Sequence, residues 1–372
     1  MRVALVHDWL TGMRGGERVL EVLCERYPRA ELFTLLHVPG SVSPIIERRR
    51  IHTSLLQWLP GARRYYRQCL PVFPTLIEQF DLERFDVVIS SSHCVAKSVL
   101  AGPRAVHVCY CHTPMRYAWD QFDAYFGSER VGSIRRTLLR RAMARLARWD
   151  RATAGRPTRY VTNSQHVARR IKRYYNREAS VVYPPVDTNF FRPDASNANG
   201  DCLIVSALVP YKRIEVAIGA CRLAGVPLSI VGSGPERARL ERVAADSGAD
   251  VTFLGRMTDE GVRDRYNQAS VVLMPGEEDF GIAPLEAQAC GRPVVALGRG
   301  GALESIVPGQ TGVLVDEATP QAFADGIRYA LSRPFDRDAI RRHAERFGRA
   351  RFGDEIQTIV DETVRTEGSQ AC

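Results

Sequence analysis

Short apolar runs and longer amphipathic stretches follow one another along the whole of this chain. Apolar runs of about four to eight residues are typical of strands buried in a parallel sheet, whereas apolar positions recurring about every three to four residues predict helices. The first half of the chain therefore contains predicted strands at residues 3–7, 86–90, 105–110, 160–163 and 180–183. Predicted helices cover residues 17–27, 134–151 and 165–175.

The second half repeats this alternation, with predicted strands at residues 202–207, 228–231, 252–254, 269–274 and 294–297. Helices are predicted at residues 213–223 and 283–290, and the chain is predicted to be largely helical from residue 319 to near residue 367. Alternating strands and helices indicate an α/β fold with doubly wound parallel sheets.

The length of 372 residues exceeds what one hydrophobic core usually supports, so two domains are expected. Residues 184–199 open on two prolines, are polar and show no period, which predicts a linker. We therefore expect one domain at residues 1–183, a linker at 184–199, a second domain at 200–350, and a final helix and tail at 351–372.

The stretch from Gly276 to Gly291 carries the strongest chemical signal, because a loop there joins a predicted strand to a predicted helix. Pro284 suits the first helical position, and Gly291 suits a left-handed helix stop. Backbone amides at the start of this helix predict an anion site.

Two glutamates, Glu278 and Glu286, flank this helix start. Ionised carboxylates only accept hydrogen bonds, so they suit neighbouring hydroxyls on a sugar or a ribose. Two simpler explanations stay open. Glu286 can stabilise the helix by about 0.3 to 1 kcal/mol through its interaction with the helix dipole, without any ligand. Glu278 can be an ordinary solvated acid.

The sequence EEDFGIAPLEAQACGRPVVA resembles the signature of the retaining, family-4 glycosyltransferases of the GT-B fold, and further matches run through nearly the whole chain. The resemblance implies two Rossmann-like domains facing a central cleft. The N-terminal domain would bind the acceptor, the C-terminal domain would bind a nucleotide sugar, and a last helix at residues 352–364 would cross back to the N-terminal domain. It also implies that Glu278 contacts the donor sugar, that Glu286 holds the ribose, and that amides at Phe280, Gly281 and Ile282 face the diphosphate.

In the first domain, Gly15 and Gly16 precede a predicted helix, where absent side chains let backbone amides approach a phosphate. A plain strand-to-helix turn is the alternative. His112 follows a predicted strand, at the edge where parallel sheets bind ligands. The resemblance implies that His112 reaches the donor sugar, whereas an isolated histidine is more often bonded to a backbone carbonyl. Asn163 and Ser164 match the family's "NS", with helix capping as the alternative.

In the second domain, Lys212 and Arg213 occupy a predicted strand-to-helix loop that resembles the family's phosphate-binding loop. Ala207 stands where the family has an arginine, so either Arg213 substitutes for it or the contact is missing. Both cations can instead be solvated surface charges. Arg256 follows a predicted strand and resembles the segment that lines the nucleobase pocket, with a surface arginine as the alternative.

Other cofactor chemistry is disfavoured by the sequence. The loop beginning at Gly232 lacks the third glycine of a dinucleotide fingerprint, because Arg237 stands in its place. No aspartate-rich metal motif is present, so we expect no metal and no cofactor, with the nucleotide sugar as a substrate. Nine cysteines without a CxxC pair indicate reduced thiols in a cytoplasmic protein.

The net charge of +9 favours an anionic partner. No helix-turn-helix, zinc finger or aromatic single-strand platform accompanies it, so nucleic acid is not expected. Arginines instead gather at residues 48–70 and 134–151, between apolar residues. Such stretches predict contact with an anionic inner-membrane surface, although the helix at 134–151 can equally pack on its own domain. No apolar run of about 18 residues and no signal-peptide pattern is present.

Four sequence segments resemble those of mannosyltransferases that build O-antigen or exopolysaccharide units: HDWLTGMRGGER, SSSHCVAKS, YCHTPMRYAWD and SALVPYKRIE. This implies GDP-mannose as the donor and a lipid-linked oligosaccharide as the acceptor, at the inner face of the cytoplasmic membrane. A transferase that uses UDP-glucose or UDP-galactose is the first alternative. A non-catalytic, nucleotide-binding scaffold at the membrane is the second.

Overall fold

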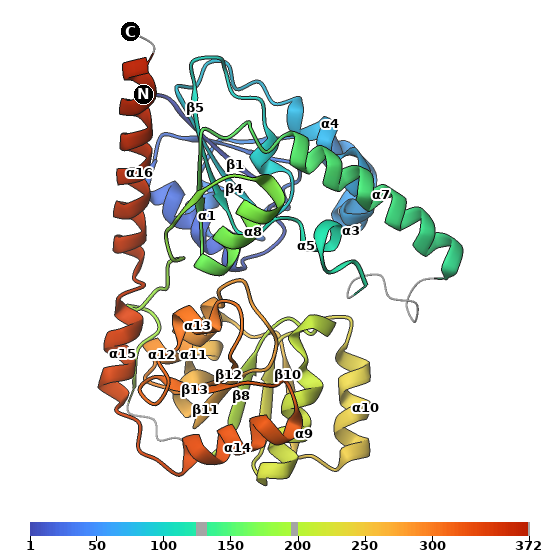
Figure 1. Cartoon of the computed structure of the whole chain (residues 1–372), viewed down its shortest axis with the longest axis vertical. Coiled ribbons are helices and arrows are strands. Elements are labelled where there is room, and N and C mark those ends of the chain that lie inside the picture. The colour runs from blue at the N-terminus through green and yellow to red at the C-terminus, as the bar shows by residue number, and fades with distance from the viewer. Residues whose placement is uncertain (124–131, 195–199, 371–372) are drawn as a thin grey trace. The chain divides into compact units, whose positions relative to one another are not determined.

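The computed structural model describes residues 1–123, 132–194 and 200–370 (Figure 1). Two compact units divide the chain. Unit 1 comprises Met1–Pro185 and Ala350–Cys372, and unit 2 comprises Val186–Arg349. Each unit is an α/β structure built on its own parallel sheet.

Unit 1 contains a parallel sheet of seven strands within its described residues, in the order β3-β2-β1-β4-β5-β6-β7. The strands are β1 (Val3–His7), β2 (Glu31–Thr34), β3 (Ile51–Thr53), β4 (Val87–Ser92), β5 (Val106–Cys111), β6 (Arg159–Thr162) and β7 (Ala179–Val181). The α-helices are α1 (Gly15–Arg26), α2 (Pro44–Glu47), α3 (Ala62–Tyr65), α4 (Phe73–Glu78), α5 (Arg116–Trp119), α7 (Ser133–Ala152), α8 (Gln165–Tyr175) and α16 (Arg349–Gln370). Short 3-10 turns are η1 (Leu55–Trp58), η2 (Tyr66–Val72) and η3 (Ala96–Ser98).

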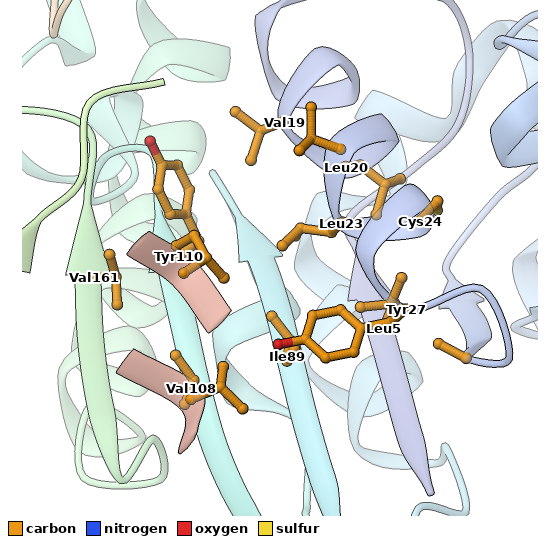
Figure 2. Packing of buried hydrophobic residues seen from close by; sticks show 14 of the residues in the cluster. Leu5, Val19, Leu20, Leu23, Cys24, Tyr27, Ile89, Val108, Tyr110 and Val161 are labelled. Carbon is orange, nitrogen blue, oxygen red and sulfur yellow. The ribbon is translucent and has the colours of Figure 1, made fainter. Parts of the chain in front are cut away.

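Both faces of this sheet are buried, which explains its nearly continuous apolar strands. Leu5 and Ile89 point into a core on one face, whereas Ala4, Val6 and Val88 point into a core on the other. Figure 2 shows Leu20 and Leu23 of α1 packed over the strands of the first core, with Leu5, Ile89 and Val108 beneath them.

Helix α16 completes the first core, although it follows unit 2 in the sequence. Phe352, Ile356 and Val360 are buried in the same cluster as Leu5. The ring of Phe352 lies edge-on to Tyr110, with ring centroids 5.5 Å apart. The prediction that the last helix returns to the first unit is therefore confirmed.

The two arginine-rich stretches differ in how they pack. In α7, Met143 and Leu146 are buried against the second core, so the C-terminal half of this helix is a packed helix. Leu138, on the other half, is 59% exposed. Residues 51–72 form β3, η1, the short helix α3 and η2, and Trp58 of η1 is 81% exposed. The side chain of residue 134, which the helical pattern placed on the apolar face, lies outside the described residues.

Unit 2 contains a parallel sheet of six strands in its described part, in the order β10-β9-β8-β11-β12-β13. The strands are β8 (Cys202–Val205), β9 (Leu228–Val231), β10 (Val251–Gly255), β11 (Val271–Met274), β12 (Val294–Leu297) and β13 (Gly312–Val315). The helices are η4 (Pro210–Lys212), α9 (Ile214–Ala224), α10 (Arg237–Ser247), α11 (Asp259–Gln268), α12 (Ile282–Ala289), α13 (Ala302–Ser305), α14 (Pro320–Leu331) and α15 (Arg337–Glu345). Helices α9 and α14 share one core with β8 and β9.

The segment predicted as a linker is folded in its first part. Val186 is buried and its backbone N–H donates to the carbonyl of Phe347, 2.9 Å away. Phe191 is also buried, with its ring centroid 5.9 Å from that of Tyr266. Residues 186–194 therefore belong to unit 2, while residues 195–199 lie outside the description.

The helix predicted at residues 283–290 begins one residue earlier, at Ile282. Pro284 is thus the third helical residue rather than the first. This position is tolerated because the N–H groups of the first turn have no partner within the helix. Gly291 has φ +73°, as a left-handed helix stop requires.

In the described part of the chain, every helix is too short or too polar to cross a membrane.

Candidate functional site

Each sheet has one point where the strand order reverses, and ligands of doubly wound folds bind beside such a point at the carboxyl ends of the strands. In unit 2 this point lies between β8 and β11, and in unit 1 it lies between β1 and β4. The candidate residues of each unit can therefore be judged by whether they follow these strands.

Lys212 and Glu278 meet at the reversal point of unit 2. Lys212 ends η4, which follows β8, and Glu278 lies in the loop after β11. Their side chains form an ion pair between Nζ and Oε1, and they are 21% and 15% exposed. The ammonium also lies 5.5 Å from the ring centre of Tyr211. The structure thus joins two candidates that are far apart in sequence.

Glycines allow the loops around this ion pair to approach one another. A Cβ atom on Gly276 would lie only 2.5 Å from the carbonyl oxygen of Tyr211. A Cβ atom on Gly301 would lie 2.1 Å from Cα of Phe280. The Gly301 N–H donates to the carbonyl of Glu278 at 2.9 Å. The loop carrying Glu278 is therefore held on both sides by backbone contacts that any larger residue would disturb.

The next part of this loop leads into α12. Phe280 is buried, Gly281 has φ +89° at the N-cap position, and Ile282 is the first helical residue. The helix start predicted from the sequence is thus present beside Glu278. The amides of Phe280, Gly281 and Ile282 remain candidates for an anion, because the first N–H groups of a helix lack intrahelical partners.

Glu286 is the fifth residue of α12, outside the first turn, so the helix dipole does not account for it. The hydroxyl of Tyr266 donates to Glu286 Oε2 at 3.2 Å. Burial and the charge of Glu286 raise the pKa of Tyr266 well above its ordinary value, so the phenol keeps its proton. Tyr266 therefore positions this carboxylate, a partner that the sequence pattern did not reveal.

Arg213 and Arg256 are the two remaining candidates of unit 2, and each is described by its place in the fold. Arg213 occupies the N-cap position of α9 with φ +51°, a left-handed conformation that costs a non-glycine residue about 1 to 2 kcal/mol. Arg256 is exposed after β10, the edge strand, which β9 separates from β8.

The glycine loop after β9 serves packing. A Cβ atom on Gly232 would lie 1.9 Å from the carbonyl oxygen of Ser206, and one on Gly234 would lie 2.2 Å from that of Leu208. These two glycines therefore let the loop after β9 rest directly on the loop after β8.

In unit 1, Gly16 and His112 lie side by side. Helix α1 begins at Gly15, two residues before the predicted start. A Cβ atom on Gly16 would lie 3.7 Å from His112 Nε2 and 3.5 Å from His7 Cε1, which are ordinary contact distances. His112 Nε2 itself lies 2.8 Å from Ser91 Oγ. The sequence alternative was a histidine ring bonded to a backbone carbonyl. The ring contact seen at Nε2 is instead with a serine hydroxyl.

The backbone of His112 is held by a second candidate. Asn163 Nδ2 donates to the carbonyl oxygen of His112 at 3.0 Å. Ser164 caps α8 by accepting from the Val167 N–H at 3.0 Å. The capping interpretation is confirmed for Ser164, whereas Asn163 positions His112.

Asp8 is a residue of this edge that the sequence interpretation did not single out. Its buried carboxylate accepts four backbone N–H groups, at 2.7–2.9 Å, from residues 93–96. It also lies 3.1 Å from Nδ1 of His93. The signal was a charged residue directly after the strand predicted at residues 3–7, in the segment HDWL. Asp8 fixes the loop after β4 to the end of β1.

Burial governs the charges at this edge. It lowers the pKa of His112 well below its ordinary value, with His93 and His7 adding to the effect. Burial also lowers the pKa of His93, although Asp8 opposes this. For Glu17, burial acts to raise the pKa, but the contact with His7 and the charges of His7 and His93 outweigh it, so the pKa is lowered. At neutral pH the two histidines are therefore neutral and Glu17 is ionised.

Two family models together match most of this chain. A family model described as Glycosyltransferase Family 4 matches residues 13–190, and one described as Glycosyl transferases group 1 matches residues 186–347. The D-inositol 3-phosphate glycosyltransferase of Mycobacteroides abscessus is 33% identical over 53% of this chain and 50% of its own length. The GDP-mannose-dependent alpha-(1-6)-phosphatidylinositol monomannoside mannosyltransferase of Mycobacterium tuberculosis is 32% identical over 47% of this chain and 52% of its own. The chain thus spans about half the length of the curated relatives it matches.

Solved structures show the same fold over the full chain. HepE of Anabaena, crystallised in complex with UDP-glucose, has a TM-score of 0.70 at 18% identity and covers 97% of this chain and 100% of its own. Sucrose-phosphate synthase of Thermosynechococcus elongatus has a TM-score of 0.66 at 17% identity, covering 100% and 98%. Two parallel-sheet units, a last helix that returns to the first, and two adjoining family matches together show that this chain belongs to the family-4 glycosyltransferases of the GT-B fold.

Proposed function

We propose that this protein is a retaining glycosyltransferase that moves a hexose from a nucleotide diphosphate sugar to an acceptor hydroxyl. The observation that carries the proposal is the Lys212–Glu278 ion pair at the strand-order reversal of unit 2, beside the start of α12. A cation, an acceptor-only carboxylate and helix-start amides are what a diphosphate joined to a sugar requires.

In this proposal the diphosphate leaves with its charge stabilised by Lys212 and by the amides of Phe280, Gly281 and Ile282. Each such contact contributes about 2.7 to 4 kcal/mol when it forms with the developing charge. The bond from the anomeric carbon to the phosphate oxygen breaks, and the acceptor oxygen bonds on the same face. The acceptor's proton passes to the departing phosphate, so no protein base is required.

Roles for the other residues follow from the family resemblance. Glu278 contacts the donor sugar, and Glu286, held by Tyr266, contacts the ribose. In unit 1, Gly15 and Gly16 are assigned to the diphosphate and His112 to the sugar. Arg213 and Arg256 are assigned to the diphosphate and the nucleobase.

The donor we propose is GDP-mannose, and the acceptor is a lipid-linked saccharide of a bacterial surface polysaccharide. The GDP-mannose-dependent mycobacterial relative supports this choice of donor. HepE, whose crystals contain UDP-glucose, supports the alternative of a UDP-hexose. Purified protein supplied with GDP-mannose, UDP-glucose or UDP-galactose would distinguish them by the release of GDP or UDP in the presence of acceptor.

Glu278→Ala tests the role of the ion pair. Turnover should be lost, whereas nucleotide diphosphate affinity should be retained or increased, because the carboxylate that competes for Lys212 is gone. Glu277→Ala, the exposed neighbour in the same loop, is the control. Unchanged turnover in Glu278→Ala would exclude Glu278 from the reaction. A wild type that binds nucleotide but turns over no donor would favour a non-catalytic nucleotide-binding scaffold.

We also propose that unit 1 binds an anionic membrane surface on the cytoplasmic side, through residues 48–72. Five large apolar side chains are exposed there, between 46% and 81%: Leu55, Trp58, Leu59, Tyr65 and Val72. Exposed arginines lie among them, at residues 48, 50, 63, 64 and 67. Apolar side chains that enter the interface, next to cations worth about 1 kcal/mol each near anionic lipid, suit such a surface. The half-packed α7 supplies a smaller share.

Sedimentation with vesicles tests this surface. Vesicles containing phosphatidylglycerol should carry the protein down at low salt, and phosphatidylcholine alone should not. The combined variant Trp58→Ser, Arg63→Gln, Arg64→Gln should lose most of this binding. Leu331→Ser with Arg333→Gln, which removes an exposed leucine and an arginine from unit 2, should bind like the wild type. Equal binding by both variants would refute the proposed surface.

A further inference from the structure

A row of polar side chains leads from α1 to His112 across the ends of β1 and β4. The parallel register places His7 opposite Ser91, and His7 Nδ1 lies 3.2 Å from Ser91 Oγ. Ser91 Oγ lies in turn 2.8 Å from His112 Nε2. At the other end, His7 Nε2 lies 3.8 Å from Glu17 Oε1. One hydroxyl thus links two imidazole rings, and a carboxylate faces the first ring.

When both rings are neutral, the chemistry of these groups permits two arrangements of protons. A hydroxyl has one proton, so Ser91 can donate to one ring and must accept from the other. A neutral imidazole likewise carries a proton on one nitrogen and accepts at its second. The direction of hydrogen bonding at one end of the row therefore determines the direction at the other end.

Glu17 selects between the two arrangements. Its side chain is 4% exposed, and Oε2 already accepts the backbone N–H of Arg14 at 3.1 Å. His7 Nε2 is fully buried and makes no hydrogen bond within the described residues, so the carboxylate 3.8 Å away favours a proton on this nitrogen. His7 Nδ1 then accepts from Ser91, and Ser91 accepts from His112 Nε2–H.

We propose that Glu17, His7 and Ser91 are positioning residues that hold His112 as its Nε2–H tautomer, leaving Nδ1 to accept a hydrogen bond from a hydroxyl of the bound sugar. The sugar contact rests on the proposed function, whereas the tautomer is a property of unit 1 without any ligand. Because burial keeps His112 neutral, one tautomer can be defined at neutral pH.

Nitrogen NMR of the histidine-labelled protein reads the tautomer directly. The chain has 8 histidines, and the His112 signals are assigned by their loss in His112→Asn. In the wild type, Nε2 should carry the proton and Nδ1 should not. A proton on Nδ1 of His112 would overturn the proposal whether or not the protein is an enzyme.

Glu17→Gln should reverse the row. The amide can still accept the Arg14 N–H through its oxygen, but it presents an N–H donor to His7 where the carboxylate was an acceptor. His112 should then carry its proton on Nδ1. Glu25→Gln, an exposed glutamate on the same helix, should leave the His112 signals unchanged. Unchanged His112 signals in Glu17→Gln would contradict the relay.

Ser91→Ala is a second variant in case Glu17→Gln does not fold. It removes the link, so the His112 signals should change to those of a mixture of tautomers. Ser90→Ala is its matched control, because Ser90 is equally buried on the opposite face of β4 and contacts His107 Nε2 at 2.8 Å instead. Signals of His112 that respond equally to both variants would refute a specific role for Ser91.

Turnover separates the relay from the sugar contact. Glu17→Gln should lower kcat/KM about tenfold, the value of one hydrogen bond, without changing the affinity for the free nucleotide. One donor lacking a single hydroxyl should be used equally well by wild type and variant. A reversed tautomer with unchanged turnover would leave the relay standing and overturn the sugar contact. A wild type inactive with every donor would instead refute the proposed function, while the NMR result would still decide the tautomer.

Discussion

The candidate sites of the two units lie at equivalent points of similar sheets but are built differently. In unit 1, Ser91 and His112 contact each other at strand ends, in a mostly buried row of side chains, and the buried Asp8 accepts backbone N–H groups of the loop after β4. In unit 2, Lys212 and Glu278 form one ion pair in partly exposed loops. Those loops are held by backbone contacts at Gly276 and Gly301.

This difference separates two ways of preparing a site for charge. A buried row of hydrogen-bonded side chains next to buried carboxylates fixes the direction of hydrogen bonds, because few proton arrangements satisfy it. A partly exposed ammonium whose partner can be exchanged is suited to meeting a charge that appears during reaction. We therefore expect unit 1 to determine orientation and unit 2 to supply most of the charge stabilisation.

The largest expected effect is that of Lys212→Ala. Turnover should fall about 100- to 1,000-fold, as when one preformed donor to a developing anion is removed. Steady-state kinetics with the preferred donor would measure it. Lys172→Ala, which removes an exposed lysine paired with Glu178 in unit 1, should stay within about twofold of the wild type. If Lys212→Ala lost less turnover than Glu17→Gln, unit 2 would not supply most of the charge stabilisation, and the proposed roles of the two units would be wrong.

The second prediction compares two glycines. Gly276→Ala should lower stability by about 1 to 3 kcal/mol, because its Cβ would lie 2.5 Å from a backbone oxygen. Gly16→Ala should leave stability within about 0.5 kcal/mol, since its contacts are of ordinary length, yet it should weaken nucleotide binding by blocking the approach to the backbone. Thermal unfolding and nucleotide titration of both variants would test this. Unweakened binding in Gly16→Ala would exclude the glycine pair from the phosphate site.

The third prediction concerns acid. Burial lowers the pKa of His107 to about 3, with nearby Lys97 and Arg156 adding to the effect. A histidine with a lowered pKa stays neutral when folded but takes up a proton when unfolded, so stability is lost as the pH falls below about 6.5. For His107 this loss should continue toward pH 3, at no more than about 1.4 kcal/mol per pH unit.

Burial lowers the pKa of three histidines in unit 1, His93, His107 and His112, and of one in unit 2, His343, so unit 1 should become the less stable of the two on acidification. Hydrogen exchange resolved by peptide, at pH 7 and pH 5, would compare the units. His107→Gln, which can keep the hydrogen bond to Ser90 but does not titrate, should flatten the dependence in unit 1. An equal acid response in the two units would contradict the comparison.

The smallest expected effect is that of Arg213→Gly. Arg213 and Asn176 are the two non-glycine residues with positive φ in the described ranges. Glycine relieves the strained backbone at Arg213, so stability should rise by up to about 1 kcal/mol, whereas Asn176→Gly should change it less because asparagine tolerates this conformation. Thermal unfolding measures both. If turnover of Arg213→Gly falls despite higher stability, Arg213 acts in place of the arginine missing at Ala207.

Much of the fold was predictable because its strands are buried on both faces and therefore appear as apolar runs. The strands at residues 31–34, 51–53 and 312–315 were missed. They are short and lie toward the sheet edges, where fewer neighbours demand apolar side chains. The helix at residues 134–151 was predicted correctly, but its pattern did not show that Met143 is buried while Leu138 is exposed.

The candidate site divides in the same way. Lys212, Glu278 and the start of α12 were found from the sequence, because helix starts and cations in strand-to-helix loops have local signatures. Tyr266 and Ser91 were not found, because a tyrosine on a helix and a serine in a strand have no such signature until the fold brings Glu286 and His112 to them.

The sequence by itself predicted most of the order of strands and helices, the presence of two units and the residue types that we propose meet a phosphate, since these depend on local periodicity and composition. Only the tertiary structure decided which side chains face one another at the reversal points, because residues 66 positions apart become partners through strand order and not through spacing. The direction of the hydrogen bonds that end at His112 belongs to that second kind, because it depends on a carboxylate 95 positions away on α1, acting through His7 and Ser91.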